Sequence, residues 1–151
     1  YKGKVVVLEF FNPDCPFIKR THTNQDFLNT VKSAQSKDVV WLAVNSNAAG
    51  RQGSSVETNQ AGRKALGVNF PILLNPEGTV GKAYGATRTP EMVVISAEGQ
   101  IVYRGGIDSS GGSKTPKDAV SYWLKDALDA HIAGKPVANA VTKPWGCGVK
   151  Y

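Results

Sequence analysis

The feature that most constrains this chain is an apolar segment that ends in a turn and a cysteine. Residues 5–11 read Val-Val-Val-Leu-Glu-Phe-Phe, a nearly continuous apolar run typical of a strand buried on both faces. Residues 12–14 form a predicted turn, and Pro16 suits the first position of a helix. Cys15 is therefore expected at a helix N-terminus, where free backbone N–H groups favour a thiolate. The alternative is a structural cysteine, because a free cysteine is often a small buried residue.

The rest of the chain alternates segments typical of strands with segments typical of helices. The order β-α-β-α-β-α-β-β-α predicts an α/β protein whose sheet ends in an antiparallel hairpin. A flexible loop rich in Asn, Ser, Ala and Gly covers 45–55, and the last helix begins with Thr115 as its cap and Pro116 at its first position. The predicted strands are 5–11, 39–44, 70–74, 92–95 and 101–104, and the predicted helices are 16–34, 55–66, 79–84 and 115–134.

Length and composition predict one globular domain over residues 1–151, with a C-terminal tail at 134–151 that carries Cys147. The net charge of +6 raises the question of nucleic-acid binding. However, the basic residues are scattered along the chain, without a strongly basic segment or a basic–aromatic stripe. No apolar run approaches the roughly 20 residues of a membrane span. We therefore expect neither a nucleic-acid partner nor a membrane span.

The two cysteines leave two explanations open. Cys15 and Cys147 are far apart, no paired CxxC motif is present, and His22 and His131 lack the spacing of metal ligands. We therefore expect no metal site. The two cysteines form either a structural disulfide in an oxidising compartment or a reactive thiol with its resolving partner. The sequence does not decide between these two explanations.

Several short segments occur in the order that is found in one known group of proteins. Asp14-Cys15-Pro16 follows the first strand, Thr89-Pro90 precedes the hairpin, residues 99–105 read Gly-Gln-Ile-Val-Tyr-Arg-Gly, and residues 145–150 read Trp-Gly-Cys-Gly-Val-Lys. On these motifs the chain resembles the redoxin group of the thioredoxin fold, which includes alkyl hydroperoxide reductase/thiol-specific antioxidant proteins and their peroxiredoxin-like relatives. The resemblance implies a thioredoxin-like fold with a central mixed sheet flanked by helices. It also implies that an N-terminal hairpin, which the relatives usually have before residue 2, is missing or truncated.

The resemblance assigns catalytic roles to three residues. Cys15 matches the nucleophile that attacks a peroxide or a disulfide. Cys147, flanked by glycines on the tail, is the candidate resolving thiol. Glu9 matches a buried strand acid that moves protons during disulfide exchange, and its apolar neighbours suit it to general acid–base catalysis. A solvated Glu9 at a sheet edge is the alternative.

The resemblance also assigns a substrate platform. Pro90 resembles the cis-proline that faces the reactive cysteine, and such a proline leaves the backbone of Thr89 free to pair with an extended substrate. An ordinary trans-proline at the start of a strand is the alternative. Arg88 and Arg104 are candidate electrostatic partners of the thiolate, with Arg88 also placed among the substrate-binding residues. For Arg88 the alternative is a surface charge.

Three departures from the family pattern restrict the chemistry. Ile18 stands where a thioredoxin has its second active-site cysteine, so cycling within a CxxC dithiol is excluded. The same residue breaks the two-cysteine motif of the copper-delivering redoxin relatives. Peroxiredoxins have a threonine three residues before the cysteine and a proline seven residues before it, whereas this chain has Asn12 and Leu8.

The sequence therefore predicts a thiol-dependent oxidoreductase or antioxidant protein that requires no cofactor. The expected partners are a peroxide or protein disulfide substrate and an external thiol reductant such as a thioredoxin. A monomer and a homodimer are both compatible with the sequence, as are the bacterial cytoplasm and periplasm. The alternative is a non-enzymatic thioredoxin-fold binding module with a structural Cys15–Cys147 disulfide.

Overall fold

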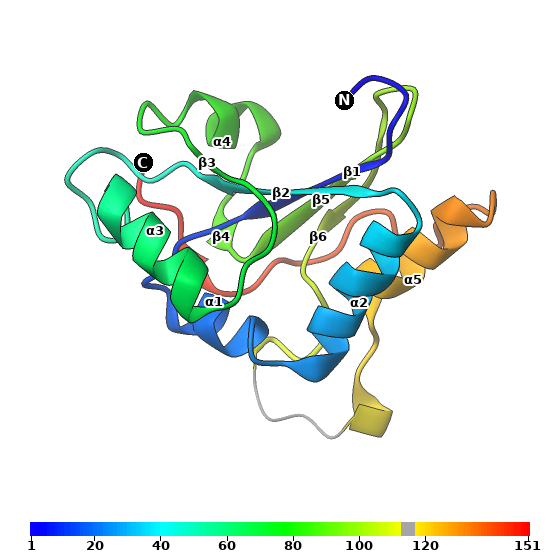
Figure 1. Ribbon diagram of the computed structural model, residues 1–151. Coiled ribbons are helices and arrows are strands. Elements are labelled where there is room, and N and C mark those ends of the chain that lie inside the picture. Colours follow the sequence, from blue (N-terminus) through cyan, green and yellow to red (C-terminus); the bar gives the residue numbers. More distant parts are fainter. Residues whose placement is uncertain (113–116) are drawn as a thin grey trace.

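The computed structural model describes residues 1–112 and 117–151. Helices α1, α2, α3 and α5 lie on one side of a central sheet and α4 lies on the other (Figure 1). The α-helices are α1 (Pro16–Thr21), α2 (Gln25–Ser36), α3 (Val56–Ala65), α4 (Thr79–Tyr84) and α5 (Trp123–Ile132), and a 3-10 turn, η1, covers Lys117–Ala119. The strands are β1 (Val6–Phe10), β2 (Val40–Asn45), β3 (Ile72–Leu74), β4 (Arg88–Thr89), β5 (Glu91–Ile95), β6 (Ile101–Gly105) and β7 (Cys147–Gly148).

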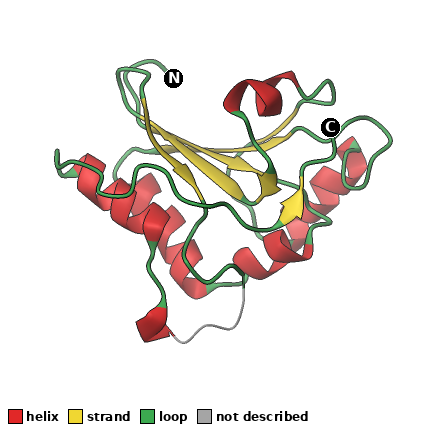
Figure 2. Ribbon diagram, turned by 180° about the vertical axis from the view of Figure 1, so that it is seen from behind, coloured by secondary structure: helices red, strands yellow, loops and turns green. Residues whose placement is uncertain are grey.

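The central sheet is mixed, as predicted. Its strand order is β3-β2-β1-β5-β6. The first three strands are parallel, whereas β5 runs antiparallel to β1 and forms an antiparallel hairpin with β6. Two short strands, β4 and β7, form a second sheet, which lies near the C-terminus in Figure 2.

Strand β1 is buried on both faces, which explains its nearly continuous apolar sequence. Val7 packs in a cluster with side chains from α1, α2 and α5, while Val6 and Leu8 pack in a second cluster that includes Ala86 beyond α4. The successive side chains thus serve opposite faces of the sheet. The same strand ends directly before the turn that carries the first cysteine.

The predicted helix 16–34 is wrong as a single helix, because the chain breaks it after the six residues of α1. His22 ends α1, and Asn24 begins α2 by accepting hydrogen bonds from the backbone N–H groups of Asp26 (2.8 Å) and Phe27 (3.2 Å). Such an N-cap satisfies donors that have no partner within the helix. The break turns the side chain of His22 into the core.

The last helix begins later than predicted. Thr115 and Pro116, on which the prediction relied, lie outside the described residues. In the described part, α5 begins only at Trp123. The residues at and just before the start of α5 bond to the loop after β6 instead. Ser109 N–H donates to the carbonyl of Ser121 (3.0 Å), and Leu124 N–H donates to the carbonyl of Ile107 (3.0 Å). These bonds compete with an earlier helical start.

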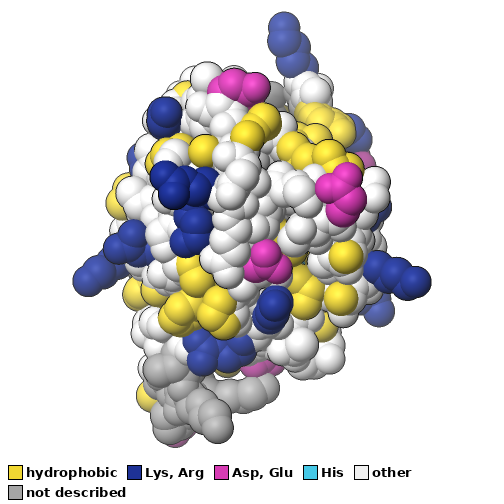
Figure 3. All heavy atoms as spheres, turned by 90° about the vertical axis from the view of Figure 1, so that its left-hand side faces the viewer, with side chains coloured by type: hydrophobic (Ala, Val, Ile, Leu, Met, Phe, Trp, Pro, Cys, Tyr) yellow, Lys and Arg dark blue, Asp and Glu magenta, His cyan; other side chains and the backbone are white. Residues whose placement is uncertain are grey.

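The surface shows how the excess positive charge is distributed. On the face in Figure 3, Lys and Arg side chains occupy several separate places among polar and hydrophobic groups. Among the described residues, no helix is both long enough and apolar enough to cross a membrane.

Candidate active site around Cys15 and Cys147

The turn after β1 places Cys15 at the N-cap of α1, with Pro16 in the first turn as predicted. Asn12 shapes this turn. Its side-chain oxygen accepts a hydrogen bond from Asp14 N–H (3.0 Å), and its backbone carbonyl accepts one from Cys15 N–H (3.0 Å). The asparagine is fully buried, and Cys15 is 1 % exposed. The cysteine is therefore held at the inner side of the turn.

The partner of Cys15 comes from the far end of the chain. Cys147 forms a disulfide with Cys15, and the two Cα atoms lie 6.2 Å apart. Cys147 is half-buried, in contrast to Cys15. The structure therefore contains the pairing that both sequence explanations require, and the more exposed of the two cysteines belongs to the tail.

Strand β4 forms the wall of the site next to the disulfide. The Sγ atom of Cys15 lies 3.2 Å from the carbonyl oxygen of Thr89, and the Thr89–Pro90 peptide bond is cis, as the resemblance implied. The hydroxyl of Thr89 is buried, and within the described residues it has no hydrogen-bond partner. Cys15, Thr89 and Pro90 thus come together from distant parts of the sequence.

The tail adds a strand to β4. In β7, Cys147 lies opposite Thr89 and Gly148 lies opposite Arg88, in an antiparallel pair. Val149 N–H then donates to the carbonyl of residue 87 (3.2 Å). The sequence analysis placed Cys147 on a tail without secondary structure, because a two-residue strand has no periodicity to detect. The tail in fact occupies the backbone that was predicted to receive a substrate.

Contacts on both sides of Cys147 fix the tail across the molecule, which it crosses from α5 to the loop after β2 (Figure 1). Thr142 N–H donates to the carbonyl of Arg104 (3.0 Å). The indole N–H of Trp145 donates to the carbonyl of Asp108 (2.8 Å). At the end, the hydroxyl of Tyr151 donates to the carbonyl of Ala86 (2.7 Å). The disulfide therefore lies in the middle of an anchored segment.

Glu9 lies in the core and not at a sheet edge, so the solvated alternative is wrong. It is fully buried; one carboxylate oxygen is 2.8 Å from Nε2 of His22, and the other accepts a hydrogen bond from Trp41 Nε1 (3.2 Å). Burial alone would lower the pKa of His22, but the charge of Glu9 and its hydrogen bond outweigh burial and raise that pKa. When the imidazole of His22 is protonated, the two side chains form a buried ion pair.

His22 is a candidate functional residue that the sequence analysis missed. Its ring packs edge-on against Phe11 and Phe27. The available signal was a polar residue followed by a strong helix cap at Asn24, which together argue against a continuous helix. A single long helix was predicted instead, and His22 was considered only as a metal ligand.

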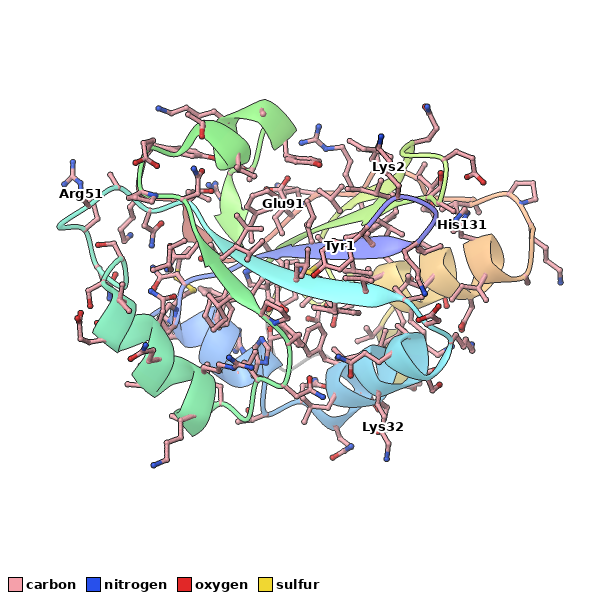
Figure 4. The ribbon with its side chains drawn as sticks, turned by 45° about the horizontal axis from the view of Figure 1, so that its top comes forward. Tyr1, Lys2, Lys32, Arg51, Glu91 and His131 are labelled. Carbon is pink, nitrogen blue, oxygen red and sulfur yellow. A yellow bond between two sulfur atoms is a disulfide. The ribbon has the colours of Figure 1, made fainter. Side chains whose placement is uncertain are left out.

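Glu91 is a second residue that was missed, and it organises β4 (Figure 4). Its buried carboxylate accepts hydrogen bonds from the backbone N–H groups of Thr87 (2.8 Å) and Arg88 (3.2 Å). Arg104, a candidate partner of the thiolate, has its guanidinium 3.6 Å from the same carboxylate. Arg88 is exposed, and its guanidinium donates to the carbonyl of Thr87 (3.1 Å). Among the described residues, Arg88 makes no ion pair.

Asn12 stands at the position where peroxiredoxins have a threonine, and both polar atoms of its side-chain amide already form hydrogen bonds. Besides the bond to Asp14, its nitrogen donates to the carbonyl of Gln52 (3.4 Å) in the loop after β2. This loop was predicted to be flexible, but Asn45 and Asn59 both donate to the carbonyl of Gly53 (2.7 and 2.9 Å). In residues 1–112 and 117–151, no three His, Cys, Asp or Glu side chains gather as a metal site.

Comparisons with solved structures place this arrangement among known proteins. An uncharacterized conserved protein from Geobacillus kaustophilus is 30 % identical, with a TM-score of 0.81; the match covers 99 % of this chain and 78 % of that one. A hypothetical protein from Sinorhizobium meliloti is 27 % identical, with a TM-score of 0.80, over 99 % of this chain and 81 % of that one. No curated protein matches the chain.

A solved structure with lower sequence identity shows which fold the chain has. A secreted Mycobacterium tuberculosis disulfide oxidoreductase, homologous to E. coli DsbE, is 22 % identical with a TM-score of 0.56, over 88 % of this chain and 83 % of that one. This confirms the predicted thioredoxin-like fold. The redoxin family model matches residues 1–121. The chain therefore belongs to the redoxin family, and this membership, together with the Cys15–Cys147 disulfide, supports a thiol redox function.

Proposed function

We propose that this protein is a two-cysteine thiol–disulfide oxidoreductase, in which Cys15 attacks a disulfide in a protein substrate and Cys147 resolves the intermediate. The observation that carries the proposal is the disulfide between a buried cysteine at a turn and a cysteine on a paired tail strand. Without a second cysteine near Cys15 in sequence, the tail supplies the thiol that completes a turnover. The same proposal includes that residues 1–151 form a single domain and that the tail takes part in the reaction through Cys147.

The proposed cycle has two exchange steps. The thiolate of Cys15 attacks one sulfur of the substrate disulfide, forms a mixed disulfide, and releases the other substrate sulfur as a thiolate. The thiolate of Cys147 then attacks Sγ of Cys15, which forms the observed disulfide and releases the second substrate thiolate. The substrate gains two electrons and the protein loses two. An external dithiol, such as a thioredoxin, returns the protein to its reduced form and becomes a disulfide itself.

Glu9 enters the proposal as the group that exchanges a proton with the site. Both of its oxygens are already bonded, one to His22 and one to Trp41. We therefore assign the proton transfer to the Glu9–His22 pair rather than to Glu9 alone. A buried pair of titratable groups can hold a proton away from water, which suits general acid–base catalysis.

Two features of the site favour a disulfide substrate over a peroxide. The amide of Asn12 is held by Asp14 and Gln52, so it is not poised to bind a peroxide. The guanidinium of Arg104 bonds to the carbonyl of Gly85 (3.3 Å) and lies beside Glu91. By contrast, the backbone of β4 already pairs with an extended segment, the tail strand β7, and the same edge would suit an extended polypeptide once the tail leaves it. The antioxidant function remains the second candidate, on family resemblance alone.

The test follows the fluorescence of the reduced protein after rapid mixing with a protein disulfide or with hydrogen peroxide. Trp145 lies on the tail and packs against Phe17 of α1, so movement of the tail changes its surroundings. We expect the protein disulfide to oxidise the reduced protein rapidly. This reaction should be lost in Cys15→Ser, and in Cys147→Ser it should stop at a trapped mixed disulfide. A faster reaction with peroxide would overturn the substrate assignment. No reaction with either would favour the binding module with a structural disulfide.

A further inference from the structure

The disulfide form of this protein has the arrangement of an enzyme–substrate mixed disulfide made within one chain. Cys147 is bonded to Cys15, as a substrate cysteine would be, and it lies opposite Thr89 in the strand pair with β4. The local sequence of the tail therefore shows which side chains the site admits on either side of a reacting cysteine. The two neighbours of Cys147, both glycines, face very different surroundings.

The position before the cysteine has no room for a side chain. Gly146 has a φ of +126°, in a region that residues other than glycine rarely adopt. A β-carbon on it would overlap the carbonyl oxygen of Thr89 and lie 3.1 Å from the nitrogen of Pro90. Both obstacles are backbone atoms beside the reactive sulfur, so they cannot turn away as a flexible side chain would.

The position after the cysteine is open and faces a positive charge. Among the described residues, and apart from its two neighbours in the chain, the only atom within 4 Å of a β-carbon built on Gly148 is Nη1 of Arg88, at 4.0 Å. Arg88 is exposed and makes no ion pair in the described part of the chain. A carboxylate at this position would have a cation within reach, whereas a lysine would face a like charge.

From these two positions we infer that the site selects protein substrates whose reacting cysteine is preceded by glycine and followed by an acidic residue, with Arg88 as the specificity-determining residue. This inference rests on the proposed function and adds its substrate sequence. It also gives the tail a second role. The tail is a tethered competitor on β4, so a substrate strand binds only after the Cys15–Cys147 disulfide is reduced and residues 146–149 leave the edge.

The experiment uses the full-length reduced Cys147→Ser protein and four short peptides. Their central sequences are Gly-Cys-Gly, Ala-Cys-Gly, Gly-Cys-Asp and Gly-Cys-Lys, each with its cysteine bonded through sulfur to thionitrobenzoate. The thiolate of Cys15 attacks the peptide sulfur, forms the mixed disulfide, and releases coloured thionitrobenzoate. Each rate is divided by the rate of the same peptide with glutathione, which removes differences in intrinsic reactivity. Competition from the tail lowers every rate by the same factor, so the ratios report the site.

We expect the Ala-Cys-Gly peptide to react at least about ten-fold more slowly than Gly-Cys-Gly, because it must strain the backbone or leave the β4 pairing. We expect Gly-Cys-Asp to react about three-fold faster than Gly-Cys-Lys, as for an exposed ion pair. Equal normalised rates for all four peptides would overturn the inference and leave the proposed function standing. Rates no faster than glutathione for every peptide would overturn the proposed function itself.

A charge reversal tests the assignment to Arg88. In Arg88→Glu we expect the preference between the aspartate and lysine peptides to invert, while the glycine-to-alanine ratio stays unchanged. Lys32→Glu is the matched control, because it makes the same change of net charge on α2, where the side chain points outward (Figure 4). The control should keep the original preference. An unchanged preference in Arg88→Glu would show that another group reads the position after the cysteine.

Discussion

The two ends of α1 are held in opposite ways. At its N-terminal end, Cys15 is bound by a disulfide to a tail whose contacts with β4 are made by backbone atoms. At its C-terminal end, the side chain of His22 is held by other side chains, namely Glu9 and its aromatic neighbours Phe11 and Phe27. A region held in part by a reversible covalent bond can respond to redox conditions. A region held by a buried ion pair responds instead to substitution and to pH.

Breaking the buried pair should produce the largest loss of stability. In His22→Leu the carboxylate of Glu9 stays in the core without its cationic partner, and we expect the free energy of unfolding to fall by about 4 kcal/mol. Asp38→Asn is the control, because it removes the exposed Lys4–Asp38 ion pair at the other end of the sheet. That change should stay within about 0.5 kcal/mol. Urea unfolding of both variants measures the difference, and equal losses would contradict a special role for burial.

Opening the disulfide should have the next largest effect. The bond closes a loop with a sequence separation of 132 residues. We expect the free energy of unfolding to fall by about 3 kcal/mol in Cys147→Ser, measured under oxidising conditions, because the unfolded chain regains its freedom. The wild-type protein under reducing conditions should match the variant. An unchanged stability would mean that the contacts of Thr142, Trp145 and Tyr151 hold the tail without the covalent bond.

A smaller change in stability should distinguish Thr87 from Thr89, which both lie on the segment that pairs with the disulfide-bonded tail. The buried hydroxyl of Thr89 has no partner within the described residues, so Thr89→Val should stabilise the oxidised protein by about 1 kcal/mol. The hydroxyl of Thr87 donates to Glu91 (3.1 Å), so Thr87→Val should destabilise it by about 1 kcal/mol. Thermal unfolding of the oxidised variants measures both changes. A loss in both would indicate that the Thr89 hydroxyl is bonded after all in solution.

The smallest expected effect is a change in the free energy of unfolding with pH, and it should depend on His22 at the C-terminal end of α1. Because folding raises the pKa of His22 above 6.5, the folded state binds the proton more tightly than the unfolded state. The resulting stabilisation is complete below pH 6.5 and is lost as pH rises through the folded pKa. Urea unfolding across this range should show the decline in the wild type. The His22→Leu variant should not show it, and a decline that persists there would assign the titration to another group.

The sequence predicted the strands and helices around this site because they carry strong local patterns. The apolar run of β1 and the helix capped by Ser55 carry strong local signals, and both appear where they were expected. Cys15 was identified from its predicted place at a helix N-terminus, and Thr89 and Pro90 were identified from the resemblance to the redoxin group. By contrast, β7 contains only two residues, and nothing local distinguishes Cys147-Gly148 from coil.

Local patterns predicted most of the strands and helices, the α/β class and the place of Cys15 at a helix N-terminus, because each of these leaves a signal within a few residues, while the thioredoxin-like fold with its mixed sheet was predicted from the resemblance. Only the tertiary structure decided the rest. It brought His22 to Glu9 across a helix break, and it laid the tail on β4 with Gly146 against Thr89. These contacts join residues far apart in the chain, and such contacts are decided by packing and strand pairing, for which the sequence carries no local signal.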